Sequence, residues 1–234
     1  MNKRVTAYDV ADHYDDAYFA DLASRYRQRN RFARQRIANV FSLMPDVKGR
    51  TVLDLGCGMG TFTLEAAGRG ARALGIDMMP TALKAAARVA REEGVADARF
   101  ALGDVARLPV RNSAADVVLA ADLTEHLDDD TFNAMLGEAQ RVLKKGGHLV
   151  LYTPEASHIF ERLRDAGVMK QDPSHIGVRT GEQLAQSVQR ARFELVRLTY
   201  LPSHLPGLNL LERRLGRWVP LLRRRAGVVA RRPA

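Results

Sequence analysis

The residues best suited to chemistry lie in a glycine-rich loop and in an acid that follows it. Gly56, Gly58 and Gly60 come directly after an apolar run that contains Asp54. Glycines at such a junction allow a tight turn and let a ligand approach the backbone closely. Asp77 follows Gly56 by 21 residues, where a second apolar run ends. An acid at that distance can accept hydrogen bonds from both ribose hydroxyls of an adenosine, so the pattern predicts an adenosine-containing ligand.

The spacing of the glycines separates two kinds of adenosine cofactor. Dinucleotide-binding loops have the pattern Gly-x-Gly-x-x-Gly, in which the start of a helix receives a pyrophosphate. Here Gly60 is followed by Thr61, and the pattern is Gly-x-Gly-x-Gly. The carboxylate of Asp54 would repel a pyrophosphate and attract a cationic amino-acid group. The loop therefore favours a cationic cofactor without phosphates over a nicotinamide dinucleotide.

Apolar runs alternate with helical patterns and predict the scaffold that positions the loop. Strands are expected over residues 51–55, 71–76, 98–102, 116–121 and 148–153, with two more over 193–201 and 227–230. Helical patterns cover residues 9–28, 30–43, 61–69, 81–93, 131–143, 155–166 and 180–190. This alternation is typical of a Rossmann-like, doubly wound and mostly parallel α/β sheet.

From about residue 50 to residue 155 the chain resembles the class I S-adenosylmethionine-dependent methyltransferases. Besides the loop and its acid, the resemblance rests on the segments GDV at 103–105, ADLTEHL at 121–127 and RVLKKGG at 141–147. It implies S-adenosyl-L-methionine as the cofactor and an antiparallel last strand in a seven-stranded sheet. It also implies that Asp104 accepts from the adenine amino group, that Val105 offers its backbone amide, and that Ala121 contacts the cofactor through its backbone. The nearest pattern is the small-molecule branch, similar to the quinone-ring O-methyltransferases.

Further cofactor contacts are expected around the loop and in the N-terminal helices. The full expected set is Asp54, Gly56, Cys57, Gly58, Asp77, Met78, Asp104, Val105, Ala121, Tyr14 and Arg36. Tyr14 belongs to a stripe at helical spacing that could close over the cofactor, or could simply pack its helix on the sheet. Arg36 lies in the region where similar quinone methyltransferases bring an arginine to the cofactor carboxylate. Cys57, without a second cysteine or a basic neighbour, is expected to pack beside the site.

Two histidines are candidates for the base that a phenol or hydroxyl acceptor would need. His126 comes just after the fourth predicted strand, at the carboxyl edge where such sheets bind ligands. His175 lies in the segment after the fifth predicted strand, which often forms the acceptor pocket in the family. The alternative is that each histidine only orients its own loop. No Asp-Asn pair of the catechol-methyltransferase type is evident, and no metal is expected.

Length and charge narrow the remaining choices. The chain has 234 residues, one cysteine and a formal net charge of +9. Residues 51–150 carry 11 basic and 14 acidic groups, so the expected site is slightly acidic, which disfavours a nucleic-acid substrate. We expect a cytoplasmic protein with one methyltransferase domain, because neither a signal peptide nor a membrane span is evident. Its parts would be a helical lid at 1–48, a cofactor-binding core at 49–155 and an acceptor region at 156–226.

The segment 208–225 combines an apolar stripe with many arginines. It could dock on its own domain, cover a pocket for a lipophilic acceptor, lie on the inner face of an anionic membrane, or contact nucleic acid. The predicted function is methyl transfer to a small-molecule acceptor, most simply to an oxygen of a phenolic, quinol-like or other lipophilic metabolite. The alternatives are a nucleic-acid or protein methyltransferase, and a non-catalytic cofactor-binding protein of the same fold.

Overall fold

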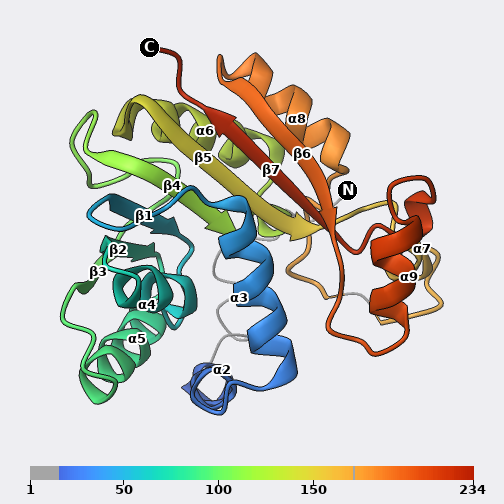
Figure 1. The fold of residues 1–234 in the computed structure, drawn as a ribbon, viewed down its shortest axis with the longest axis horizontal. Helices are drawn as coiled ribbons and strands as arrows, with labels where there is room; N and C mark the ends of the chain where they lie inside the picture. The colour runs from blue at the N-terminus through green and yellow to red at the C-terminus, as the bar shows by residue number, and fades with distance from the viewer. Residues whose placement is uncertain (1–15, 171) are drawn as a thin grey trace, which may run out of the picture.

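One mixed sheet runs through the part of the chain that the structure describes, residues 16–170 and 172–234 (Figure 1). In this computed structural model the strands are β1 (Thr51–Leu55), β2 (Arg72–Asp77), β3 (Ala98–Leu102), β4 (Ala115–Ala121), β5 (Leu143–Pro154), β6 (Glu194–Leu201) and β7 (Arg225–Arg231). Their order across the sheet is β3-β2-β1-β4-β5-β7-β6. The pairs among β1 to β5 are parallel, whereas β7 is antiparallel to both β5 and β6. The predicted Rossmann-like α/β fold with an antiparallel last strand is confirmed.

Helices cover both faces of the sheet. They are α2 (Asp16–Arg27), α3 (Arg31–Leu43), α4 (Thr61–Gly68), α5 (Pro80–Glu92), α6 (Asp129–Val142), α7 (Ile159–Asp165), α8 (Gly181–Arg190) and α9 (Leu208–Leu215), with 3-10 turns η1 (Thr124–His126) and η2 (Pro220–Leu222). Side chains of α3, α4 and α5 share a core with Val117 and Leu119, and those of α6 and α8 share another with Val118 and Ala120. Alternate residues of β4 thus face opposite layers. Because both faces are buried, its sequence is an unbroken apolar run.

The order of the strands creates a crevice where β1 and β4 lie side by side. After β1 the chain builds β2 and β3 on one side, and β4 then pairs on the other side of β1. The loops that leave the carboxyl ends of these two strands therefore diverge, which is where ligands bind in such sheets. Gly56 follows β1, Asp122 follows β4 and Asp77 ends β2. The topology thus brings the residues singled out in the sequence to one edge.

Several predicted elements differ in extent from those observed. The fifth strand begins at Leu143 rather than at residue 148, because residues 146–147 exchange backbone hydrogen bonds with Arg232. The amphipathic segment is helical only over α9, and Pro220 starts a separate 3-10 turn, since proline cannot continue a helix. Residues 9–15 of the first predicted helix, with Tyr14, lie outside the described residues. Among the described residues, no helix has both the length and the apolar character needed to cross a bilayer.

Candidate active site

The glycine loop joins β1 to α4 through backbone conformations that favour glycine. Gly56 and Gly60 have φ angles of +64° and +84°, in the left-handed region. A Cβ added at Gly60 would lie 2.7 Å from the ring of Phe100 on β3. The amides of Gly56 and Cys57 both donate to the carbonyl of Ile76 on β2, at 2.8 and 3.1 Å. The loop is therefore fixed against the neighbouring strand.

Asp77 holds this loop in place. One carboxylate oxygen accepts from the amide of Gly58 at 2.8 Å and the other accepts from the amide of Met79 at 2.8 Å. Burial raises the pKa of Asp77, and the hydrogen bonds from Met79 and Gly58 oppose that rise. Each oxygen has a further lone pair with which it could accept a hydroxyl. Met78, beside it, is exposed.

Asp54 lies beneath the loop in the core. Its carboxylate is buried and accepts from the hydroxyl of Thr63 on α4 at 2.7 Å. Burial raises the pKa of Asp54 to about 7, so its charge is sensitive to any cation that comes close. Cys57 is also buried, and burial raises the pKa of its thiol. A Cβ at Gly75 would lie 2.7 Å from its sulfur, so Cys57 packs tightly against β2.

The third strand and the fourth strand contribute the other expected cofactor contacts. Asp104 is exposed and accepts from the amide of Ala106 at 2.8 Å, which orders the turn after β3. Val105, the next residue, is buried. Ala121 ends β4 and is 5% exposed, so it can offer a ligand little besides backbone. These residues lie at the same edge of the sheet as Asp77.

An ion-pair network that the sequence did not predict surrounds Asp122, the residue after Ala121. Asp122 has a φ of +52° and accepts from Nη1 of Arg225 at 2.6 Å and from Nε of Arg36 at 2.9 Å. Burial acts to raise the pKa of Asp122, but Arg225 and Arg36 outweigh it and lower the pKa. The structure thus engages Arg36, expected at the cofactor carboxylate, in a pair that ties α3 to the end of β4. The three residues of this network come from segments that are distant in the sequence, so no local pattern could reveal it.

The two candidate bases lie together. The ring centroids of His126 and His175 are 4.9 Å apart, and the rings meet edge to face. Nδ1 of His126 is 3.1 Å from the carbonyl oxygen of Ser174. Glu125 is buried between these loops and β5, and its carboxylate accepts from the hydroxyl of Thr153 at 2.9 Å. The sequence indicated both histidines separately, but it did not predict that they meet or that Glu125 joins them.

A small cavity opens beside the Asp122 network. Its volume is about 30 Å³, and it is lined by Phe32, Gln35, Arg36, Asn39, Tyr152, Pro202, Ser203, His204, Arg224 and Arg225. Nδ2 of Asn39 donates to the hydroxyl of Tyr152 at 3.1 Å, so the polar wall of this cavity is ordered. Residues from α3, β5 and β7 therefore form a partly aromatic recess next to the crevice.

The residues around the loop fit an adenosine cofactor that carries a cationic group and no phosphate. Gly60 lets the loop pack closely against Phe100, and Asp77 offers two fixed acceptor oxygens. The buried acid Asp54 suits a cation, whereas a pyrophosphate beside two buried carboxylates would be repelled. The observed geometry therefore matches S-adenosyl-L-methionine better than a dinucleotide.

Comparisons with known proteins lead to the same cofactor and fold. Residues 46–195 match the family described as "Methyltransferase domain". No curated protein matches the chain at a significant level.

Similar solved structures cover most of the chain. One is a chain of the complex between the Haloferax volcanii Trm112 methyltransferase activator and a methyltransferase (17% identity, TM-score 0.69, covering 92% of this chain and 96% of that one). A second is an S-adenosylmethionine-dependent methyltransferase from Mesorhizobium loti (20% identity, TM-score 0.63, covering 83% of this chain and 96% of that one). A third is the geranyl diphosphate C-methyltransferase from Streptomyces coelicolor A3(2), solved with Mg²⁺, geranyl diphosphate and S-adenosyl-L-homocysteine (19% identity, TM-score 0.65, covering 83% of this chain and 80% of that one). The chain belongs to the methyltransferase domain family and is an S-adenosylmethionine-dependent methyltransferase.

Proposed function

We propose that this enzyme transfers a methyl group to an oxygen of a small, lipophilic acceptor such as a phenol or quinol-like metabolite. The observation that carries the proposal is the His126–His175 pair at the carboxyl end of β4, one short turn after Ala121. When bound, S-adenosylmethionine supplies an electrophilic methyl group on a sulfonium, so the protein's task is to position the acceptor and remove its proton.

The cofactor would be held by the residues at the edge of β1 to β4. Asp77 would accept from the ribose hydroxyls with the lone pairs that the loop amides leave. Asp104 and Val105 would contact the adenine, and Ala121 would offer its backbone. Asp54 would stabilise the cationic amino-acid end from beneath the loop, because an approaching cation favours its charged form. Gly56, Gly58, Cys57 and Met78 would form the wall of this site.

The histidine pair would supply the base, and the contacts of the two rings support that role. A carbonyl oxygen carries no hydrogen, so the contact of His126 with Ser174 requires Nδ1 to be the donor. The lone pair of the neutral ring is then on Nε2, where it can accept a proton. Burial and the neighbouring His126 lower the pKa of His175, which keeps its ring neutral at pH 7. A neutral ring in this position can accept a proton from the acceptor or hold its hydroxyl.

One structural relative bears on the size of the acceptor. The geranyl diphosphate C-methyltransferase was solved with geranyl diphosphate, a small isoprenoid, although it methylates carbon rather than oxygen. Phe32 and Tyr152 line the recess beside Asp122, but its volume of about 30 Å³ is that of about one water molecule, so it would have to widen to admit an acceptor.

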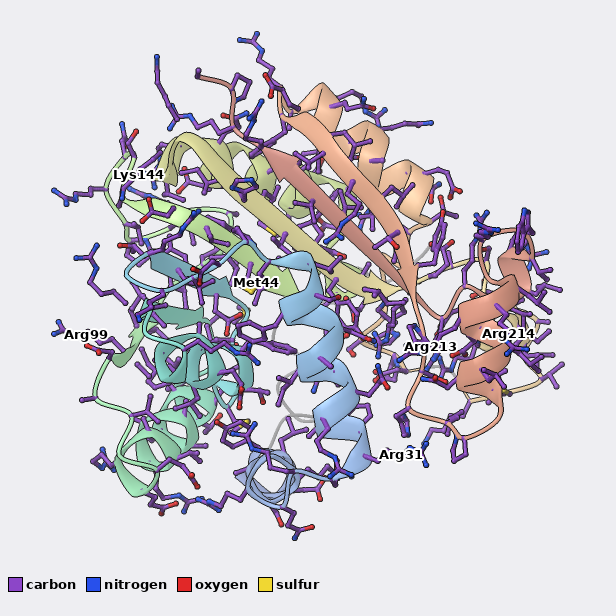
Figure 2. All side chains as sticks on the ribbon, in the orientation of Figure 1. Arg31, Met44, Arg99, Lys144, Arg213 and Arg214 are labelled. Carbon is purple, nitrogen blue, oxygen red and sulfur yellow. The ribbon has the colours of Figure 1, made fainter. Side chains whose placement is uncertain are left out.

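A second part of the proposal is that the acceptor is taken from an anionic membrane surface. The segment from α9 to η2 exposes large apolar side chains, among them Leu210, Leu211, Trp218 and Leu221, and Trp218 is 63% exposed. Figure 2 shows Arg213 and Arg214 on the same helix, at one end of the molecule. Apolar side chains beside arginines are the pattern that binds anionic bilayers.

Trp218 is the only tryptophan, so its fluorescence reports this contact directly. We expect an emission shift with vesicles that contain phosphatidylglycerol and none with phosphatidylcholine alone. The double variant Arg213→Glu/Arg214→Glu should lose the shift, and the distant Arg99→Glu should keep it. Equal shifts with both kinds of vesicle would refute the electrostatic part of the contact.

The transfer itself is tested with S-adenosylmethionine labelled in its methyl group and a panel of phenols, quinols and lipid extracts. We expect label in an O-methyl product, and a rate at least tenfold lower for His126→Gln. His148→Gln, on β5 opposite Val117 and so away from the carboxyl end of β4, is the control and should retain activity. Methylation of RNA or protein but of no small molecule would overturn the proposed acceptor class.

A further inference from the structure

The three side chains at the end of β4 have the composition of a metal site. One potential ligand atom each from Glu125, His126 and His175 lie within 4.8 Å of one another. Two imidazoles and one carboxylate form a donor set that zinc and other divalent transition metals use in enzymes. We propose that Glu125, His126 and His175 bind a divalent transition-metal ion beside the methyl acceptor. The sequence alone gave no reason to expect this, because the two histidines are 49 residues apart.

The observed spacing is close to that of a formed site. Bonds of about 2.0–2.2 Å to a tetrahedral metal place ligand atoms about 3–4 Å from each other. Atoms within 4.8 Å therefore need to move by about 1 Å or less to bind one ion, which side-chain rotation can supply. The backbone does not have to rearrange.

Two of the three ligands are oriented by a second interaction. The hydrogen bond from Nδ1 of His126 to the carbonyl of Ser174 leaves Nε2 as the ligand atom, as metal-binding histidines usually require. The hydroxyl of Thr153 donates to one oxygen of Glu125 and does not consume the other. Nε2 of His175 lies 3.9 Å from the carboxylate of Asp172, beyond hydrogen-bond distance, so this ring has only a weaker electrostatic partner.

The two loops that carry the histidines are fixed to one another. The amide of Gly177 donates to the carbonyl of Glu125 at 2.8 Å. The guanidinium of Arg179 donates to the carbonyls of Thr124 and Leu127, at 2.9 and 3.1 Å. A Cβ at Gly177 would lie 2.0 Å from the Leu127 oxygen, so only glycine allows this approach. The site is therefore held ready by backbone contacts independent of a ligand.

The local charges favour a cation here. Arg36 and Arg225 both bind Asp122, so the acids that can balance an added positive charge are Glu125 in the cluster and Asp172, 3.9 Å from Nε2 of His175.

A cation in this position would act on the same acceptor, and this role rests on the proposed function. It would bind the hydroxyl oxygen of the acceptor and lower its pKa, so that the proton leaves to water; in the metal-bound form the two histidines are ligands and this route replaces direct proton removal by a histidine. The acceptor would then be one with an oxygen that can bind a metal, such as a phenol, rather than a carbon or nitrogen nucleophile.

Zinc titration by calorimetry, without cofactor or acceptor, tests the site. The protein is the full chain, freed of any affinity tag and treated with chelator. We expect one equivalent of Zn²⁺, much weaker binding of Mg²⁺, and at least a tenfold loss of zinc affinity in His175→Ala and in Glu125→Gln. His175 lies in a loop, so its variant leaves the core intact, and His204→Ala is the matched control that should bind zinc normally.

Absence of zinc binding, or equal affinity in the wild type and in His126→Ala/His175→Ala, would overturn the metal site. Binding of S-adenosylhomocysteine and methyl transfer are measured on the same preparations. Loss of the metal inference alone would leave both intact, whereas failure of the proposed function would show as zinc binding without any methylated small molecule.

Discussion

Asp77 is the residue whose replacement tests the cofactor site most directly. In Asp77→Ala the amides of Gly58 and Met79 both lose their acceptor. An unsatisfied buried donor costs about 1–3 kcal/mol, and Asp77 is 9% exposed, so water can reach the site in part. We therefore take the low end for each amide and expect the free energy of unfolding to fall by about 2 kcal/mol.

The effect on the cofactor is separate from that on the fold. Loss of the hydrogen bonds to the ribose hydroxyls should weaken binding by about 1–3 kcal/mol, which raises the Kd about 5- to 150-fold. Calorimetric titration with S-adenosylhomocysteine measures the affinity, and urea unfolding on the same protein measures the stability. Asp77→Asn keeps one acceptor oxygen and should lie between the wild type and Asp77→Ala in both measurements.

Asp46→Ala is a matched control for the structural part of this effect. Asp46 also accepts from an amide two residues ahead, that of Lys48 at 3.1 Å, but it is exposed and precedes β1, whereas the loop follows that strand. Asp46→Ala should lower the free energy of unfolding only slightly and leave the Kd for S-adenosylhomocysteine unchanged. An unaltered Kd for folded Asp77→Ala would refute the assignment of Asp77 to the ribose.

Three further predictions concern the same edge of the sheet. Asp54 has a pKa of about 7 in the folded protein against an ordinary value of 3.8, so between these pH values the native state binds a proton that the unfolded state does not. The free energy of unfolding should therefore fall from pH 4 to pH 7, by up to about 4 kcal/mol. In Asp54→Asn, urea unfolding should show a smaller fall over the same range. Gly60→Ala should cost about 2–4 kcal/mol in the same assay, from left-handed strain and collision with Phe100, whereas Gly94→Ala, with φ +67° and open space, should cost about 1 kcal/mol. Asp122→Asn keeps the shape but leaves two partly buried guanidiniums without a counter-charge, and should lower the free energy of unfolding by about 2–3 kcal/mol, less than for a fully buried pair. A loss below about 1 kcal/mol would show that these arginines find other partners.

The parts of the fold that could be predicted are those set by local pattern. The run of β4 and the glycines at 56–60 carry their own signals, because burial on both faces and positive φ angles restrict which residues can occur there. Asp77 was indicated by its distance from the loop alone. The extent of β5 could not be predicted, because residues near its start form backbone hydrogen bonds with Arg232, which lies near the other end of the chain.

The parts of the site that escaped prediction depend on contacts between distant segments. Each histidine was recognised by type and place, but their meeting depends on the bond from Gly177 to Glu125 and on the clamp by Arg179. Neither a glycine nor an arginine indicates such a contact in a sequence. The three-residue cluster could therefore be found only once the loops were placed.

Asp122 connects the two halves of the site. It directly follows Ala121, and its carboxylate binds Arg36 from α3 and Arg225 from β7. Those two arginines also line the aromatic recess. Any movement of α3 that opens the recess must therefore break a charged contact next to the cofactor edge, and a partly buried ion pair is costly to separate. This physical link predicts that weakening Asp122 should alter acceptor KM more than cofactor affinity, because the cofactor contacts on β1 to β3 do not depend on the network.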